Sequence, residues 1–286
     1  MADADKTRMA ALRALREADL PAASALTGSF QWPHRPEDWA FMHALGQGLA
    51  VERAGKLAAT GLLVPYGEEA AALGMVSVAP ELQGQGLGRA MMQGLLDLAG
   101  SRVVGLYATQ AGEKLYRQLG FATLGAACQF QGATFTTTLQ PLPDGERVRP
   151  TGRSDRVAIA ALDRAATGLD RSMLVNALLK TGTAVVLDRG GAPAGFAVLR
   201  RFGRGQVIGP VMAEDMVGAK ALVSHFLNLT PGQFIRVDVV EDSGLAPWLA
   251  ALGLSDAGRV LHMVRGAAPV PTGPARRFAL AGQTFG

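Results

Sequence analysis

A short stretch near residue 80 constrains the fold most, because it specifies a strand, a tight turn and a helix in direct succession. Val76 and Val78 are β-branched and alternate with smaller residues, as on a half-buried strand, and Pro80 removes a backbone donor and ends it. Glycines follow at 84, 86 and 88. From Leu87 onward apolar residues recur at spacings of four and three, the period of an amphipathic helix. The glycine turn therefore opens directly onto a helix N-terminus.

The N-terminus of a helix attracts anions. Its first N–H groups lack acceptors within the helix, and the aligned peptide dipoles leave about half a positive charge there. Glycine lets a phosphate approach the backbone because no Cβ atom stands in the way. Two common phosphate motifs, the dinucleotide fingerprint G-x-G-x-x-G with its later acidic residue and the P-loop ending in G-K-[ST], do not fit. The stretch therefore predicts a phosphate loop of another kind, with a pyrophosphate as the natural guest.

The pattern that fits is Q-x-x-G-x-G, formed by Gln83, Gly86 and Gly88 after V-x-V-x-P. It resembles the acyl-CoA-binding segment of the GNAT superfamily of N-acetyltransferases. The resemblance covers about residues 8 to 140. It implies a mixed α/β sheet, and because the second half of the chain repeats the first, the whole chain is expected to be a tandem GNAT-like acyl-CoA N-acyltransferase fold with two similar domains.

A second segment supports the same resemblance. Residues 106–121 read as a short strand and then a helix ending in Y-x-x-x-G-F, whose tyrosine is Tyr116, much as in the second signature of the family. In detail, Trp32-Pro33-His34, Ala108-Thr109 and Leu115-Tyr116 look most like the two-domain subgroup that includes the YitH-like acetyltransferases. Two segments in the expected order are a stronger indication than either alone.

The resemblance implies acetyl-CoA as the cosubstrate. The backbone of Val76 and Val78 would align the pantetheine arm as though it were another strand, and an N–H near Val78 would face the thioester oxygen as an oxyanion donor. The amides of residues 83–89 would hold the pyrophosphate. Arg89 either places a positive charge near the phosphates or is a solvent-exposed arginine in the first turn of the helix. The predicted acetyl-CoA site comprises Val76, Ser77, Val78, Gln83, Gly84, Gln85, Gly86, Leu87, Gly88 and Arg89.

The sequence offers one candidate for the general acid of the transfer and several candidates for the general base. Tyr116 matches the family tyrosine that protonates the departing thiolate, and a phenol with a pKa near 10 can donate that proton at neutral pH. The alternative is that Tyr116 has only a structural role, as a buried tyrosine of the helix. Glu68 or Glu69, before the strand that leads into the loop, would take the amine proton directly or through water, or is solvated. His34 has the better unperturbed pKa for that role.

The acceptor site has candidates in the first half. Residues 29–39 hold two prolines and two tryptophans, and in the family this region walls the acceptor site. Trp32 and His34 therefore either contact the substrate or pack against the first helix, whereas Trp39 is expected in the core. Further candidates for lining the acceptor pocket are Tyr107 and Thr109, at the end of a strand near the site.

Asp238 and Glu241 flank the end of a strand in the second half. They would face the cleft between the halves and attract a cationic acceptor, or they are surface charges. The other histidines, His43, His225 and His262, have no ligand spacing, so no metal site is expected.

Periodicity and turn residues predict the order of elements in the first half. A helix is expected over residues 8–27 and another after the aromatic loop, and residues 126–138 are expected to close the domain as a hairpin of short strands. The remaining expected elements are strands at 48–53, 57–64, 70–78 and 103–108 and helices from 87 and over 111–119.

A proline-rich stretch, residues 139–150, predicts a boundary, which divides the chain into a catalytic domain at 1–140, a linker at 141–150 and a second domain at 151–286. The second domain is expected to repeat the first but to lack its loop, because Glu214 and Asp215 would repel phosphate. Its expected elements are helices at 155–166, 171–179 and around Trp248, and strands at 182–187, 194–200, 206–213 and 234–240.

Length and composition agree with this reading. A chain of 286 residues suits two domains, and an apolar fraction of 49% with 18% charged residues is ordinary for a globular protein. The net charge of +4 is mild and has no basic block, so no nucleic-acid partner is expected. Without an apolar run of 18 residues or a basic-then-apolar N-terminus, no membrane partner is expected and a cytoplasmic location is predicted. Cys128, the only cysteine, excludes an internal disulfide.

The sequence thus predicts an acetyl-CoA-dependent N-acetyltransferase that acetylates a primary amine of a small molecule by direct attack in a ternary complex. No covalent intermediate is expected, because Cys128 has no identifiable partner. The alternatives are a CoA-binding regulatory or sensor module and an acetyltransferase acting on a protein amine. The identity of the amine, the base, the acyl chain length, the oligomeric state and any ligand of the second domain stay open.

Overall fold

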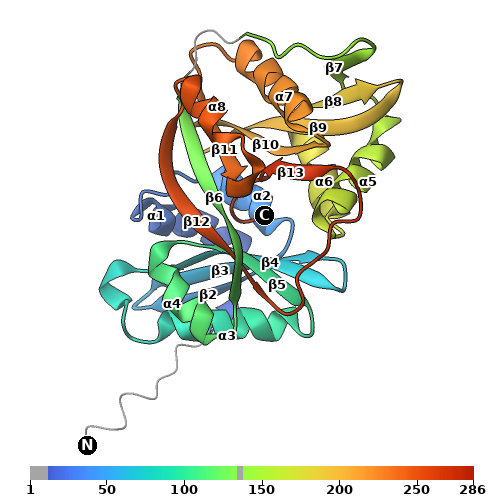
Figure 1. Ribbon diagram of the computed structural model, residues 1–286. Helices are drawn as coiled ribbons and strands as arrows, with labels where there is room; N and C mark the ends of the chain where they lie inside the picture. Colours follow the sequence, from blue (N-terminus) through green and yellow to red (C-terminus); the bar gives the residue numbers. More distant parts are fainter. Residues whose placement is uncertain (1–11, 134–137) are drawn as a thin grey trace, which may run out of the picture.

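The computed structural model describes residues 12–133 and 138–286. Within them, strands from both halves join one mixed sheet of 13 strands in the order β1-β2-β3-β4-β5-β12-β6-β11-β13-β10-β9-β8-β7. Figure 1 shows the first half below and the second above, with β6 and β12 running between them. The mixed α/β class expected from the sequence is confirmed.

The first half matches the expected elements from the aromatic loop to α4. The helix expected at 8–27 is wrong in its first part: from residue 12 the chain forms a strand and a short 3₁₀ turn, and the helix begins at Leu20, with Pro21 in its first turn. Residues 8–11 lie outside the described part. The elements are β1 (Leu12–Ala14), a 3₁₀ turn (Glu17–Asp19), α1 (Leu20–Gly28), α2 (Pro36–His43), β2 (Gln47–Arg53), β3 (Lys56–Tyr66), β4 (Ala70–Val78), a 3₁₀ turn (Pro80–Leu82), α3 (Leu87–Ala99), β5 (Val103–Ala108), α4 (Gln110–Gln118) and β6 (Ala122–Ala133).

The second half also follows the expected order. The end of the stretch expected as a linker forms a strand, β7, which pairs with β8 at the edge of the sheet. The elements are β7 (Glu146–Pro150), α5 (Asp155–Thr167), α6 (Ser172–Thr181), β8 (Thr183–Arg189), β9 (Ala192–Phe202), β10 (Gly205–Ala213), α7 (Met216–Leu229), β11 (Phe234–Val240), a 3₁₀ turn (Glu241–Ser243), α8 (Ala246–Ala251), β12 (Ser255–Arg265) and β13 (Arg276–Ala279).

The halves exchange strands at their junction. The hairpin expected at 126–138 is wrong over the residues described, because β6 is one long strand that pairs with β11 on one side and β12 on the other. β12, from the second half, also pairs with β5 of the first. The partners that a local hairpin would have supplied therefore come from more than 100 residues away.

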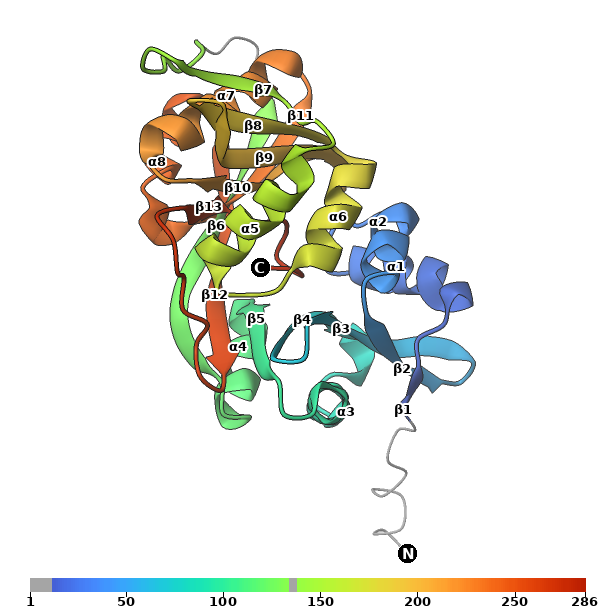
Figure 2. The same cartoon turned by 90° about the vertical axis from the view of Figure 1, so that its right-hand side faces the viewer.

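Three large apolar clusters hold the sheet. One lies under α3 in the first half and one under α7 in the second. The third joins the halves: Trp39 and Met42 of α2 share it with Leu174 of α6, Phe196 of β9 and Phe285. Trp39 is fully buried, as expected. Figure 2 shows the C-terminal segment entering between α5 and the strands β4 and β5. No helix among the described residues is long and apolar enough to cross a membrane.

Candidate active site

Strand β4 separates from its neighbour halfway along. Residues 70–73 pair in parallel with residues 103–106 of β5, and within the described residues no strand pairs with that edge of β4 beyond Leu73. On its other edge, Met75 and Val76 stand opposite the single residue Gly61 of β3, which is a β-bulge. Met75 has a positive φ of 55°. The bulge separates the second half of β4 from β5, so the edge of residues 74–78 on that side has no strand partner among the described residues.

Two hydroxyls, one on β3 and one on β4, stabilise this bulge. The Thr60 side chain is fully buried and donates to the Met75 carbonyl at 3.0 Å. It also lies 2.8 Å from the Ser77 hydroxyl. A buried hydroxyl with two partners fixes the backbone of the bulge, because breaking either bond would leave a polar atom unsatisfied. Ser77, predicted to contribute to the acetyl-CoA site, therefore supports β4 with its side chain.

The glycine turn presents a row of free amides. Among the described residues, the N–H groups from Gly84 to Arg89 donate no hydrogen bond, whereas the Gln83 N–H donates to the Pro80 carbonyl. Gly84 and Gly86 have positive φ values of 76° and 84°, and a Cβ on either would meet nothing within 4 Å. Glycine is thus needed at these positions for the backbone conformation, and the space in front of the amides is open.

Two side chains of the predicted acetyl-CoA site, Gln83 and Arg89, make hydrogen bonds that hold the loop against β4 and α4. Gln83 donates to the Val78 carbonyl at 3.1 Å, which ties the turn to the end of β4. Arg89 donates to the side chain of Gln118 at the end of α4. Gly88 lies against Leu115 of α4 and Val78, so α4 packs beside the N-terminus of α3.

Tyr116 lies on α4 and is folded back over the previous turn of its own helix. A Cβ on Gly112 would stand 2.6 Å from the Tyr116 ring, so a larger residue there would push the ring aside. The ring also packs 6.0 Å from that of Phe121. Burial raises the pKa of Tyr116 to about 12. Burial is the only cause of that shift, and the hydroxyl makes no hydrogen bond to a described residue, so it stays protonated with its hydrogen free.

A cavity of about 350 Å³ lies between the halves and reaches the bulge of β4 at Gly74 and Met75. It brings together four of the residues expected around the acceptor: Trp32, His34, Tyr107 and Thr109. The second half contributes residues from β9, β11, β12 and the C-terminal segment. These are Arg200, Phe202, Arg236, Ala257, Gly258, Arg259, Val260, Gly282, Gln283, Thr284 and Phe285.

The candidate bases differ in position. His34 lines the cavity, and its Nδ1 is buried without a partner among the described residues. Burial, together with the nearby Arg236 and Arg200, lowers the pKa of His34 to about 4, so the ring is neutral at pH 7. Glu68 and Glu69 are exposed in the turn before β4, and Glu69 lines neither cavity. Val78 lies nine positions after Glu69, roughly 30 Å along an extended strand.

Asp238 and Glu241, the two candidate carboxylates of the second half, each form an ion pair with an arginine. Asp238 is fully buried behind the cavity wall, with its carboxylate 3.0 Å from the Arg236 Nε and 3.2 Å from the Gln283 side chain. Glu241 is exposed and pairs with Arg259 at 2.5 Å. Neither carboxylate lines the cavity.

The second half has no counterpart of the free amides. The Asp215 side chain accepts the Gly218 N–H at 2.7 Å and so caps α7 from within. Asp215 and Glu214 also pair with Arg189 at 2.6 and 2.7 Å. A phosphate at this helix end would have to displace these carboxylates.

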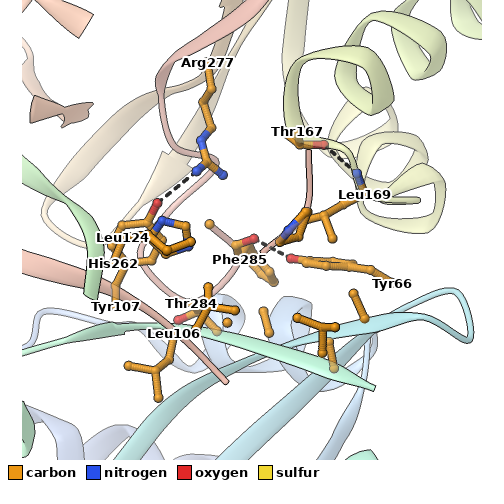
Figure 3. Close-up of a pocket in the computed structure, with 18 of the residues that line it drawn as sticks. Tyr66, Leu106, Tyr107, Leu124, Thr167, Leu169, His262, Arg277, Thr284 and Phe285 are labelled. Atoms are coloured by element: carbon orange, nitrogen blue, oxygen red, sulfur yellow. Dashed lines mark hydrogen bonds between the residues drawn. The ribbon is translucent and has the colours of Figure 1, made fainter. Parts of the chain in front are cut away.

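A smaller cavity of about 210 Å³ adjoins the first, sharing Tyr107 and residues 283–285 with it. Figure 3 shows its walls, with Arg277 donating to the Tyr107 hydroxyl at 3.1 Å and Tyr66 donating to the Phe285 carbonyl. The His262 ring stacks on Tyr107 at 4.8 Å. No group of His, Cys, Asp and Glu side chains suited to a metal ion occurs in the part of the chain that the structure describes.

Two family models match the two halves. One, described as the acetyltransferase (GNAT) family, matches residues 10–121, and the other, described as an acetyltransferase (GNAT) domain, matches residues 159–279. The chain belongs to the GNAT family of acetyltransferases. It is therefore a transferase with two GNAT domains, as the sequence motifs predict. The subgroup suggested by the sequence stays a prediction.

Solved structures share this GNAT fold over nearly the whole chain. A candidate acetyltransferase from Pyrococcus horikoshii is 17% identical, with a TM-score of 0.78 over 96% of this chain and 95% of that one. A GCN5-related N-acetyltransferase from Sphaerobacter thermophilus is 18% identical, with a TM-score of 0.62 over 92% and 98%. A tandem GNAT protein from the clavulanic acid biosynthesis pathway is 16% identical, with a TM-score of 0.64 over 92% and 99%. No curated protein matches the GNAT chain in sequence.

Sequence reasoning missed the arginines of this GNAT cavity. Arg200 and Arg236 lie in strands of the second half, outside any motif. Each lies in a mainly apolar strand that holds one other charged residue, Arg201 in β9 and Asp238 in β11, and a charged residue within such a strand is the local signal that could have marked them.

Proposed function

We propose that this GNAT protein transfers an acetyl group from acetyl-CoA to a primary amine of a small molecule. The observation that carries the proposal is the row of acceptor-free amides from Gly84 to Arg89, at the end of a strand whose edge is also free. Such a row suits a diphosphate, and a free strand edge suits an amide-bearing chain such as pantetheine. Acetyl-CoA carries both groups in one molecule.

The proposed binding mode uses backbone more than side chains. The amides of residues 84–89 would hold the diphosphate, with Arg89 beside them, and the edge of Val76, Ser77 and Val78 would hold the pantetheine arm. The acetyl end would then lie toward the bulge at Met75, which lines the larger cavity. A free N–H near Val78 would act on the thioester oxygen as an oxyanion donor.

The proposed reaction is direct attack of the amine on the thioester. Tyr116 would give its free hydroxyl proton to the departing thiolate, and its raised pKa keeps that proton present at neutral pH. His34 is the base candidate that lines the cavity, and its unpartnered Nδ1 would take the proton that the amine loses as the C–N bond forms and the C–S bond breaks. Cys128 lies outside the lining of both cavities, and burial raises the pKa of its thiol, which favours transfer without a covalent enzyme intermediate.

The shape of the cavity favours a small acceptor. A volume of about 350 Å³ walled by both halves is within the range of small-molecule sites. We propose the division expected from the sequence, with residues 1–140 catalytic, 141–150 connecting and 151–286 shaping the acceptor pocket. The capped N-terminus of α7 supports a second half that binds no CoA.

Release of free thiol from acetyl-CoA in the presence of a panel of primary amines tests this proposal. We expect release above the hydrolysis background with at least one small amine, together with the acetylated amine in the mass spectrum. CoA binding without release for any small or peptide amine would favour a regulatory module instead. Release with peptide amines alone would favour a protein acceptor.

A further inference from the structure

We propose that the acceptor amine also carries a carboxylate, which Arg200 and Arg236 bind in the second half. This inference rests on the proposed transfer to a small amine and names the chemical class of that amine. The cavity is lined by three arginines, Arg200, Arg236 and Arg259, and by no aspartate or glutamate. A wall of this composition attracts an anion.

The sheet of the second half brings Arg200 and Arg236 together. Arg200 of β9 and Arg236 of β11 are both in register with Val207 of the intervening strand β10. Paired residues of neighbouring strands point to the same face of a sheet, so both side chains leave the face that meets the first half. Both guanidinium groups lie over the ring of Phe202, with their central carbons 4.7 and 5.4 Å from its centroid.

The charges around this pair do not cancel. Arg236 is neutralised by Asp238, 2.9 Å away, and Arg259 by Glu241, 2.5 Å away. Arg200 has no ion pair among the described residues: it is 6% exposed, donates to the Ala281 carbonyl at 3.0 Å, and leaves its buried Nε without a partner.

The other titratable groups near Arg200 do not supply the missing negative charge. Asp38, behind the aromatic loop, accepts from Arg35 at 2.7 Å and from the Gly203 N–H at 2.9 Å, so its charge is already matched. His34 is neutral at pH 7. One buried positive charge is therefore left over at the cavity wall. A buried charge without a partner is costly, and a bound anion would remove that cost.

A carboxylate fits this wall better than other anions. The planar guanidinium matches the two oxygens of a carboxylate, and one surplus positive charge matches one negative charge, whereas a phosphate close to charge −2 would leave a surplus of its own. The same cavity is also lined by Gly74 and Met75, where the acetyl end is proposed. An amino acid, with its carboxylate at the arginines and its amine toward β4, can span the two.

Binding measurements on the whole chain test the inference without depending on turnover. With CoA present, calorimetric titrations would compare L-leucine, L-phenylalanine, L-lysine and L-glutamate with their primary amides, and O-phosphoethanolamine would represent a phosphate-bearing amine. We expect at least one amino acid to bind at least about tenfold more tightly than its amide and than O-phosphoethanolamine. Equal binding of acids and amides, tighter binding of the phosphate compound, or no binding of any amino acid would overturn the inference.

Two matched variants locate the effect. Arg200→Gln removes the surplus charge, and Arg201→Gln removes an exposed charge from the next position of the same strand. We expect Arg200→Gln to raise the KM of the preferred amino acid at least about tenfold and to abolish the preference over the amide, with the CoA Kd unchanged. Arg201→Gln should leave both unchanged. A preference that survives in Arg200→Gln would contradict the assignment.

Two further measurements keep the result interpretable. If the CoA titration shows that Arg200→Gln fails to fold, Arg200→Lys replaces it, because lysine keeps the charge but lacks the planar guanidinium. We expect Arg200→Lys to reduce the preference for the amino acid over its amide in part. An unchanged preference overturns the inference. CoA binding and amine acetylation without any advantage for carboxylates would reject this inference alone. Absence of CoA binding would reject the proposed function itself.

Discussion

Tyr116 is the residue on which the proposed proton transfer depends. Replacing it with phenylalanine removes the hydroxyl and keeps the ring over Gly112 and beside Phe121. We expect Tyr116→Phe to lower kcat by about a hundredfold, the scale of a lost general acid, and to leave the CoA Kd unchanged. Steady-state kinetics with acetyl-CoA and the best amine measure both.

Tyr66→Phe serves as the comparison for Tyr116→Phe. Tyr66 donates to the buried Phe285 carbonyl, which also accepts from Arg171, so the lost hydrogen bond should lower the free energy of unfolding by about 0.5–1.5 kcal/mol. Urea unfolding measures that loss. A normal kcat in Tyr116→Phe would remove this tyrosine from the mechanism.

His262 predicts how stability depends on pH. Burial first, and Arg277 second, lower its pKa to about 4 in the folded chain, against 6.5 as the ordinary value. Between these values the unfolded chain binds a proton that the folded chain does not, so the free energy of unfolding falls as the pH drops from about 6.5 to 4. We expect His262→Phe, which retains an aromatic ring for stacking on Tyr107, to reduce this fall.

Thermal unfolding of both proteins at pH 7.5 and pH 4.5 measures that difference. The quantity that decides is the change in melting temperature between the two pH values, compared between wild type and variant. An identical change in the two proteins would show that His262 does not contribute.

Residues tied to a motif could be predicted from the sequence, and residues brought together only by strand pairing could not. Trp32 and Tyr107 follow from the order of family segments, and the structure brings both to one cavity. Arg200 and Arg236 depend on the register of β9 and β11 across β10. No local pattern encodes that register.

At the scale of elements, the turn between β4 and α3 and the helix that follows it are each indicated by a separate feature of the sequence. The glycines predict the turn, and the apolar period predicts the helix that follows it. No sequence signal indicates the bulge at Met75. A positive φ is usually found at glycine, and here a methionine adopts it. The buried Thr60 hydroxyl fixes that conformation.

Gly86→Ala tests the loop as an element. The new Cβ would meet no atom within 4 Å, so the cost arises from the φ of 84°, about 1–2 kcal/mol. We expect the loop to relax toward negative φ and turn its amides away, weakening CoA binding about tenfold. Gly28→Ala is the control, because its Cβ also meets open space but its φ lies outside the positive region. Equal CoA affinity in Gly86→Ala would contradict a role for the amide row.

Two expected elements are wrong because tertiary partners override local preference. The helix expected at 8–27 has a favourable composition, yet Leu12–Ala14 pairs with β2 and forms a strand. The hairpin expected at 126–138 has alternating apolar residues, but β11 and β12 provide the partners. Periodicity indicates that a strand is present and does not indicate which strand pairs with it.

At the scale of the whole molecule, the two GNAT domains are joined by more than a linker. β12 lies between β5 and β6, and the C-terminal segment is buried between the halves. Arg171 of the second half donates to the carbonyls of Phe285 and Gly286, and Tyr66 of the first half donates to the same Phe285 carbonyl. The halves should therefore unfold together.

Arg171→Met tests this coupling. The Arg171 side chain is fully buried, 2.6 Å from Asp163, so the variant leaves a buried carboxylate without its partner. We expect a loss of about 3–5 kcal/mol in the free energy of unfolding, still in one calorimetric transition. Arg164→Met breaks an exposed pair with Asp170 at 3.9 Å and should cost less than about 1 kcal/mol. Two separate transitions in the wild type would contradict a joined fold.

The measurement closest to the central claim follows the loop amides themselves. In ¹⁵N-labelled protein, CoA at saturation should move the amide protons of residues 84–89 downfield, because each would gain a phosphate acceptor. Pantetheine, which has no diphosphate, should move only amides of β4 and its neighbours. Loop amides that stay in place at full CoA occupancy would show that the diphosphate binds elsewhere.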